Sequence, residues 1–159
     1  MSDIFESAAL AFTLPHKQAQ RYAVNLHRQV RRAADQYQNS RTTQPKLADI
    51  PEEFREDTIL EGWHFDVKGA GQNRLYMTVE DGFEFADALG AFIHHLLRKF
   101  DTAGFVQFEW SRTCSRPEPT CFSGGAAHIT ADEIRFYTTS DWLSERSKTE
   151  HRLNRTCLA

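Results

Sequence analysis

The sequence predicts an α+β domain: a mainly antiparallel sheet of about five strands, a core helix on one face of the sheet, and an amphipathic basic helix at the N-terminus. Two observations predict this class. Five segments alternate apolar and polar residues as half-buried strands do, and short turns join two pairs of them. Between the two hairpins, one long segment repeats apolar residues every three or four positions, as the buried face of a helix does.

The composition is that of one folded domain. The chain has 159 residues, of which 40% are hydrophobic and 12% aromatic, and its formal net charge is -3. This length suits a single hydrophobic core, and the aromatic content argues against a disordered chain. No apolar run is long enough to cross a membrane, and the acids near the N-terminus do not fit a signal peptide. We therefore expect a cytoplasmic protein with no membrane partner.

The first predicted helix runs from His16 to Asn39 and has a cationic side. Pro15 suits a helix start, and the segment contains no glycine. At about 100° per residue, one stripe of this helix is apolar, formed by Tyr22, Leu26, Val30, Ala33 and Tyr37. The opposite side carries five candidate partner-binding residues, namely Lys17, Arg21, Arg28, Arg31 and Arg32. The apolar stripe would pack on the rest of the domain or on a second copy of the chain.

Charge divides the chain into a basic N-terminal part and an acidic middle. Residues 15–46 hold seven Lys or Arg and one acid, whereas residues 47–101 hold five Lys or Arg and twelve acids. Residues 39–51 are polar, contain two prolines and predict a linker. We therefore divide the chain into an N-terminal helix and linker over residues 1–50 and an α+β domain over residues 51–159, folded as a single globular unit. Either the two charged segments face each other, or the basic side of the helix is an ordinary solvated face, or it contacts a partner.

The predicted hairpin and core helix follow the linker. A short acidic helix is expected at Glu52–Leu60, and a hairpin at Trp63–Lys68 and Arg74–Val79, around a glycine-rich turn. Gly82–Asp101 has one broad apolar face and predicts the core helix, with Gly104 as a stop signal.

The C-terminal part predicts three more strands. Phe105–Arg112 alternates apolar and polar residues, and residues 125–130 and 134–139 form a second hairpin. Ser140 can cap a last helix that begins at Asp141. The expected order is therefore helix, two strands, helix, three strands, helix, while the order of strands within the sheet stays open.

The outward face of the predicted sheet carries side chains that could perform acid–base chemistry. Histidine, carboxylate and tyrosine suffice for proton transfer if they converge. The candidates are His64, Tyr76, Glu109 and His128. An exposed sheet face also needs polar residues for solubility, and we favour binding of a partner through this face over catalysis.

The segment from Arg112 to Gly125 is the most unusual in composition. It holds two prolines and ends in adjacent glycines, and its candidate site residues are Arg112, Cys114, Arg116, Gly124 and Gly125. Adjacent glycines before a strand let a ligand or another backbone approach closely. The alternative is a structured crossover between two strands. Whether Cys114 and Cys121 form a disulfide stays open, although a reducing cytoplasm disfavours it.

Metal binding is not expected. His94 and His95 are adjacent on the predicted helix, so their side chains point about 100° apart and cannot easily share an ion. The spacing of Cys114 and Cys121 is also wider than that of a zinc knuckle. We predict no catalytic residue, no metal and no cofactor.

Four short motifs stand out in the C-terminal half. They are Phe105-Val-Gln-Phe-Glu-Trp110, Thr113-Cys-Ser-Arg-Pro117, Phe122-Ser-Gly-Gly-Ala-Ala127-His-Ile-Thr130 and Asp141-Trp-Leu143. Together they resemble an uncharacterised family of small proteins encoded by bacterial phages, prophages and plasmids, over about residues 63–143. The resemblance implies a mobile genetic element in a bacterial cytoplasm, where small proteins often block host machinery, as anti-CRISPR proteins do.

We therefore expect a non-enzymatic binding protein of a mobile genetic element that inhibits host defence, such as CRISPR or restriction machinery, by contact with a host protein. The contact would use the basic helix or the outer sheet face. The second hypothesis is nucleic-acid binding through the basic helix, marked by strong salt dependence. The third is a small enzyme with an acid–base site on the open sheet face. A homodimer is compatible with all three.

Overall fold

The computed structural model of the chain describes residues 4–39, 47–82, 84–115 and 123–145, and its centre is one antiparallel six-stranded sheet. Along the sheet the strands run in the order β2-β3-β1-β4-β5-β6. Their bounds are β1 Ile4–Thr13, β2 Asp66–Gly69, β3 Arg74–Gly82, β4 Val106–Cys114, β5 Ser123–Ile129 and β6 Ile134–Thr138. The predicted α+β class is confirmed, and five of these strands are those that the alternation predicts.

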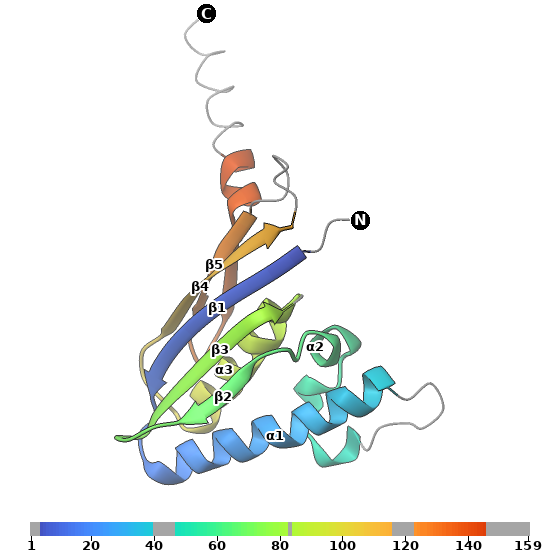
Figure 1. Cartoon of the computed structure of the whole chain (residues 1–159). Helices are drawn as coiled ribbons and strands as arrows, with labels where there is room; N and C mark the ends of the chain where they lie inside the picture. Colours follow the sequence, from blue (N-terminus) through green and yellow to red (C-terminus); the bar gives the residue numbers. More distant parts are fainter. Residues whose placement is uncertain (1–3, 40–46, 83, 116–122, 146–159) are drawn as a thin grey trace, which may run out of the picture.

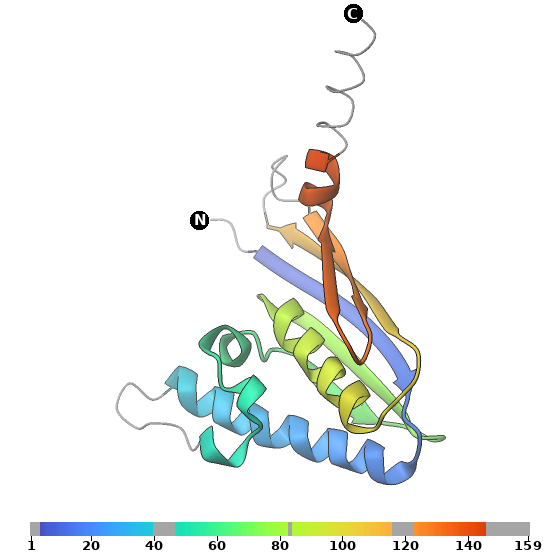
Figure 2. The same cartoon turned by 180° about the vertical axis from the view of Figure 1, so that it is seen from behind.

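Helices cover one face of the sheet and one of its edges. They are α1 Lys17–Asn39, α2 Asp57–Glu61 and α3 Phe85–Lys99, with two short 3-10 helices between the first two, η1 Leu47–Asp49 and η2 Glu52–Phe54. In Figure 1 α3 lies behind the strands, and in Figure 2 it lies in front of them, whereas α1 runs along the β2 edge. Among the described residues, no helix lies over the opposite face, which carries Ala9, Tyr76, Glu109 and Tyr137 and which we call the outer face.

β1 is the strand that the sequence does not predict. It pairs with β3 on one side and with β4 on the other, so it lies inside the sheet. Its inward residues pack on the core, but its outward positions hold Ala9 and Ala11 rather than polar residues, which obscures the alternation. The boundary expected at residue 50 therefore does not separate two units, because residues 4–13 supply an inner strand of the same sheet.

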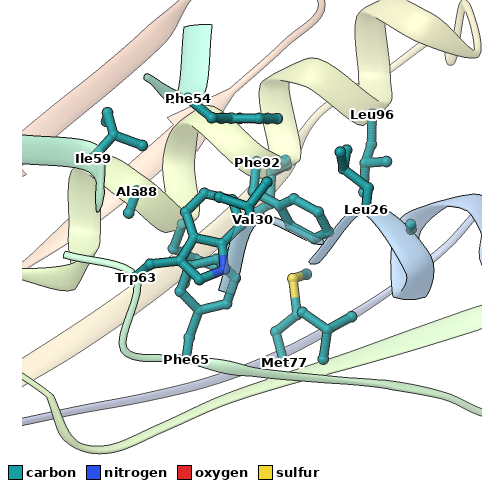
Figure 3. Packing of buried hydrophobic residues seen from close by; sticks show 14 of the residues in the cluster. Leu26, Val30, Phe54, Ile59, Trp63, Phe65, Met77, Ala88, Phe92 and Leu96 are labelled. Carbon is teal, nitrogen blue, oxygen red and sulfur yellow. The ribbon is translucent and has the colours of Figure 1, made fainter. Parts of the chain in front are cut away.

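The apolar stripe of α1 packs on the domain and not on a second copy. Leu26 and Val30 are buried, and Figure 3 shows them beside Phe92 of α3 and Met77 of β3. The two tyrosines of the stripe are half-buried and pack against the same core. This arrangement corrects the idea of a homodimer through the stripe, because its side chains already lie inside the fold.

α1 is also hydrogen-bonded to backbone carbonyls at the two ends of β2, the edge strand of the sheet, and at the start of β3. An edge strand leaves a row of backbone groups without partners. Gln20 Nε2 donates to the carbonyls of Ala70 and Arg74, at 2.5 and 2.7 Å, and His27 Nε2 donates to the carbonyl of Phe65 at 2.8 Å. The position of α1 is therefore fixed by hydrogen bonds as well as by apolar packing.

Three helical segments differ in extent from the prediction. The core helix expected at Gly82–Asp101 runs from Phe85 to Lys99, because β3 extends to Gly82. The acidic segment expected as one helix at Glu52–Leu60 forms η2 and α2, with Arg55 capping η2. The last helix covers residues 139–145, so it begins two residues before the predicted Asp141.

Candidate partner-binding surfaces

Four of the five predicted cations form one exposed row on α1. Successive members are four, seven and four residues apart, and all four are exposed: Lys17, Arg21, Arg28 and Arg32. At about 100° per residue, these spacings keep the side chains within roughly 60° of the helix circumference. At a rise of about 1.5 Å per residue, the row is about 22 Å long. We call these four residues the cation row.

The fifth predicted cation, Arg31, has a different environment. Its side chain is half-buried and turns toward β2, where Nη1 lies 3.4 Å from the Phe65 carbonyl oxygen. Its Nε lies 3.4 Å from Oδ1 of Asp35, one turn further along the same helix. Arg31 therefore helps to hold α1 against the sheet edge and does not belong to the cation row.

The acidic middle of the chain does not neutralise the cation row. None of its four side chains forms an ion pair with any other described residue. Acids do gather at the C-terminal end of α1, where Asp57 accepts a hydrogen bond from Tyr37 and Gln38 donates to the carbonyl of Glu61. The row is therefore open along its length, with negative charge beyond one end.

The outer face carries a shallow hollow between β1 and β4. The pairing of these strands ends at Ala8 and Trp110, although both strands continue past that point. The hollow has a volume of about 910 Å³ and begins where this pairing ends. Alanines form much of its lining, and its polar and aromatic lining residues are Gln107, Phe108, Glu109, His128, Arg135 and Tyr137.

Two of the four predicted acid–base residues meet in this hollow. Glu109 and His128 both line it, on neighbouring strands. Nδ1 of His128 lies 3.0 Å from Nε2 of Gln107, and its ring stacks on Phe105 at a centroid distance of 4.9 Å. The imidazole is thus engaged by neighbours other than Glu109.

The other two predicted acid–base residues lie elsewhere. Tyr76 is exposed on β3, where the guanidinium of Arg74 sits 5.2 Å from its ring centre. His64 precedes β2, and its Nε2 lies 3.3 Å from Nε2 of Gln38 on α1. The structure therefore does not bring the four residues together as one site.

The predicted loop site is divided in the same way. Arg112 and Gly124 line one cleft of about 420 Å³. Arg112 is bound there to the buried carboxylate of Glu6, a partner that sequence reasoning missed because it lies on the unpredicted β1. Cys114 is disulfide-bonded, so it offers no thiol for catalysis. Arg116 and Cys121 lie outside the described residues.

The adjacent glycines make room for Trp110. Gly125 pairs with Trp110 across β4 and β5, and a side chain at Gly125 would collide with the indole ring. A side chain at Gly124 would collide with the backbone carbonyl of Trp110. Gly124 therefore serves one of the two uses expected for these glycines, which is the close approach of another backbone.

A hydrogen-bonded chain that sequence reasoning missed joins three helices. Nδ1 of His95 on α3 donates to Oε1 of Glu53 on η2 at 2.6 Å, and the Tyr22 hydroxyl on α1 lies 2.8 Å from Nε2 of the same ring. Burial, and then the charge of Glu53, raises the pKa of Tyr22. Its hydroxyl is therefore a proton donor that ties α1 to α3. No sequence signal marks this group, because its members come from three distant segments.

The pKa of Glu53 reflects the same contact. Partial burial raises it, but the hydrogen bond to His95, a backbone hydrogen bond and the charges of His95 and Arg98 together lower it overall. Beside this group lies an open cavity of about 830 Å³, with Glu52 and Glu56 on one wall and Arg98 and Lys99 on the other. Glu53 lines the cavity too, so three carboxylates and the two bases Arg98 and Lys99 share one lining.

The adjacent histidines of α3 point to different partners. Nε2 of His94 lies 3.1 Å from the Ala131 carbonyl, whereas His95 binds Tyr22 and Glu53. Within the described ranges, no three or more His, Cys, Asp or Glu side chains are grouped so that they could hold a metal ion. In the same part of the chain, no helix has both the length and the apolar character needed to cross a membrane.

Comparison with known proteins adds no relative from which a site could be transferred. No family model, curated protein or solved structure matches this chain. The functional proposal therefore depends on the surfaces described above.

Proposed function

We propose that this chain is a non-enzymatic binding protein of a mobile genetic element, and that its cation row docks on an acidic surface of a host defence protein. The observation that carries the proposal is four exposed cations in line on one helix without acidic partners among the described residues. Like charges four residues apart destabilise a helix by a few tenths of a kcal/mol. Two such pairs, Lys17 with Arg21 and Arg28 with Arg32, therefore slightly lower the stability of α1.

The anchoring of α1 supports a docking role. Gln20, His27 and Arg31 bind backbone carbonyls at the β2 edge, so the helix is held before any partner arrives. A helix backbone that is already in place loses little conformational entropy on binding, and complementary charge speeds the encounter. The resemblance of residues 63–143 to proteins of phages and plasmids supports the choice of a host protein as the partner.

A protein surface fits the row better than a nucleic acid does. The row is about 22 Å long, comparable with one compact acidic patch. A longer polyanion that followed the helix axis would meet Asp35, Asp57 and Glu61 beyond the C-terminal end of the row. The net charge of -3 also opposes non-specific attraction to phosphates.

The first test identifies the class of partner. The full chain is used to capture proteins from a bacterial lysate, with and without nuclease, and the captured material is identified by mass spectrometry. We expect one host protein to remain after nuclease treatment and to elute as salt is raised. If everything captured disappears with nuclease, the cation row binds nucleic acid and the proposal is wrong.

Two variants with the same change in net charge then locate the contact. The row variant is Arg21→Gln, Arg28→Gln and Arg32→Gln, which removes three positive charges. The flank variant is Gln18→Glu, Gln29→Glu and Gln36→Glu, which adds three negative charges at exposed positions of α1 outside the row. We expect the row variant to lose the captured protein and the flank variant to keep it.

A further inference from the structure

The outer face of the sheet has a basic half and an acidic half, which lie on opposite sides of a line drawn across the strands. On β3, Arg74 and Glu80 are each three residues from Met77, and on β2, Lys68 and Asp66 are each one residue from Val67. Val67 pairs with Met77, so one line across the strands divides bases from acids. The exposed side chains of both strands follow this division.

The other half of the sheet continues the line but carries the division only in part. Phe108, Ala127 and Phe136 are paired across β4, β5 and β6 and continue the same line. Arg135 lies on the basic side of the line but forms an ion pair at 2.9 Å with Glu133, which lies just before β6 on the same side, and Glu109 lies on the acidic side. The register of β1 with β3 and β4 connects the two halves, because Leu10 pairs with Met77 and Ala8 with Trp110.

We propose that the outer face is the interface of a homodimer, in which a second copy is stacked face to face about a two-fold axis along this line. Such an axis turns the basic half of one copy onto the acidic half of the other. Lys68 then faces Asp66 of the second copy, and Arg74 faces Glu80 of the second copy.

The size and shape of the face suit a second copy. Six strands at about 4.8 Å spacing and an average length of about 25 Å give roughly 700 Å² per copy, which is the size of a standard specific interface. Tyr76 and Tyr137 project from the face with 43% and 56% of their surface exposed.

Dimerisation through the outer face does not depend on the function proposed for α1. α1 lies along the β2 edge and not over the outer face, so both cation rows stay exposed in the dimer (Figure 1). Two rows on one particle would bind a repeated acidic partner more tightly than one row does, through a raised effective concentration.

The test is a charge swap within one chain, read by sedimentation equilibrium over a range of concentrations at low salt. The broken variant is Lys68→Glu with Arg74→Glu, and the swapped variant adds Asp66→Lys and Glu80→Arg. We expect the wild type to dimerise and the broken variant to raise the dissociation constant about tenfold or more. The swapped variant, with its net charge restored, should return to within about threefold of the wild type.

Three results would overturn the proposal: a wild-type monomer at all concentrations, a broken variant that dimerises as well as the wild type, or a swapped variant as weak as the broken one. Circular dichroism and thermal melting show whether each variant is folded. Should the swapped variant fail to fold, the broken variant is mixed with an Asp66→Lys, Glu80→Arg chain. The two must then pair one to one although neither pairs with itself, and failure to pair overturns the proposal.

Discussion

The buried carboxylate of Glu6 on β1 binds the guanidinium of Arg112 on β4 through one oxygen, with Oε1 at 2.6 Å from Nε and 2.5 Å from Nη2. Its other oxygen accepts the backbone N–H of Glu84 at 2.9 Å, at the start of α3. A carboxylate at that place is stabilised by the positive end of the helix as well as by the arginine. One side chain therefore joins the unpredicted strand, its neighbour and the core helix.

Glu6→Gln should lower the free energy of unfolding by about 2 kcal/mol. The amide keeps the size of the side chain but loses the charge, and its N–H₂ group would face donors. Urea denaturation measures the change. The control is Glu56→Gln, an exposed carboxylate that makes no side-chain cap bond, which should change the free energy by less than about 0.5 kcal/mol. Equal losses in the two variants would contradict the role given to Glu6.

Gly125→Ala should destabilise the chain by about 2 kcal/mol, because the new methyl group collides with the indole of Trp110 and must displace it. Gly71→Ala is the matched control, since a Cβ there meets nothing within 4 Å. Thermal melting of both variants tests the comparison. If Gly125→Ala melts at the temperature of Gly71→Ala, the glycine does not serve the packing of Trp110.

Acid should destabilise the fold through His27. Burial lowers the pKa of His27, as do the charges of Arg31 and Arg28, and these effects outweigh the Phe65 carbonyl and Asp66, which raise it. The folded pKa therefore lies below the unfolded value of about 6.5. The stability that depends on neutral His27 is complete above that pH and is lost as pH falls toward the folded pKa.

The measurement is the free energy of unfolding between pH 7 and pH 5, for the wild type and for His27→Gln. The wild type should lose stability more steeply, by up to about 1.4 kcal/mol per pH unit. Slopes are compared, and not absolute stabilities, because the substitution also disturbs packing while the other histidines titrate in both chains. Parallel curves would show that His27 does not sense pH.

The sequence predicts the individual helices and strands of this fold better than it predicts their arrangement in space. Five strands and two long helices follow from local alternation and periodicity, which burial of one face imposes on each segment. β1 escapes because Ala9 and Ala11 face outward where polar residues are usual. The central position of β1 then hides the strand order, and with it the contact of Glu6 with Arg112, which are 106 residues apart.

The candidate surfaces show the same limit. The helical period is enough to predict that the four members of the cation row share one exposed side of α1, since this needs only their spacing. The helical wheel also groups Arg31 with the row, but its side chain turns toward β2. A projection of one helix cannot show the neighbouring strand. The division of the outer face into bases and acids depends on the register of the strands. It can therefore be recognised only when the pairing of the strands in the sheet is known.

The central claim is that the cation row is a docking surface for a protein. The most direct measurement is a titration of the captured host protein, after nuclease treatment, against the wild type, the row variant and the flank variant. The row variant should raise the dissociation constant about tenfold or more, while the flank variant, with the same change in net charge, should stay within about threefold of the wild type. Equal weakening by both variants would mean that net charge and not the row governs binding, and unchanged binding by the row variant would place the contact elsewhere.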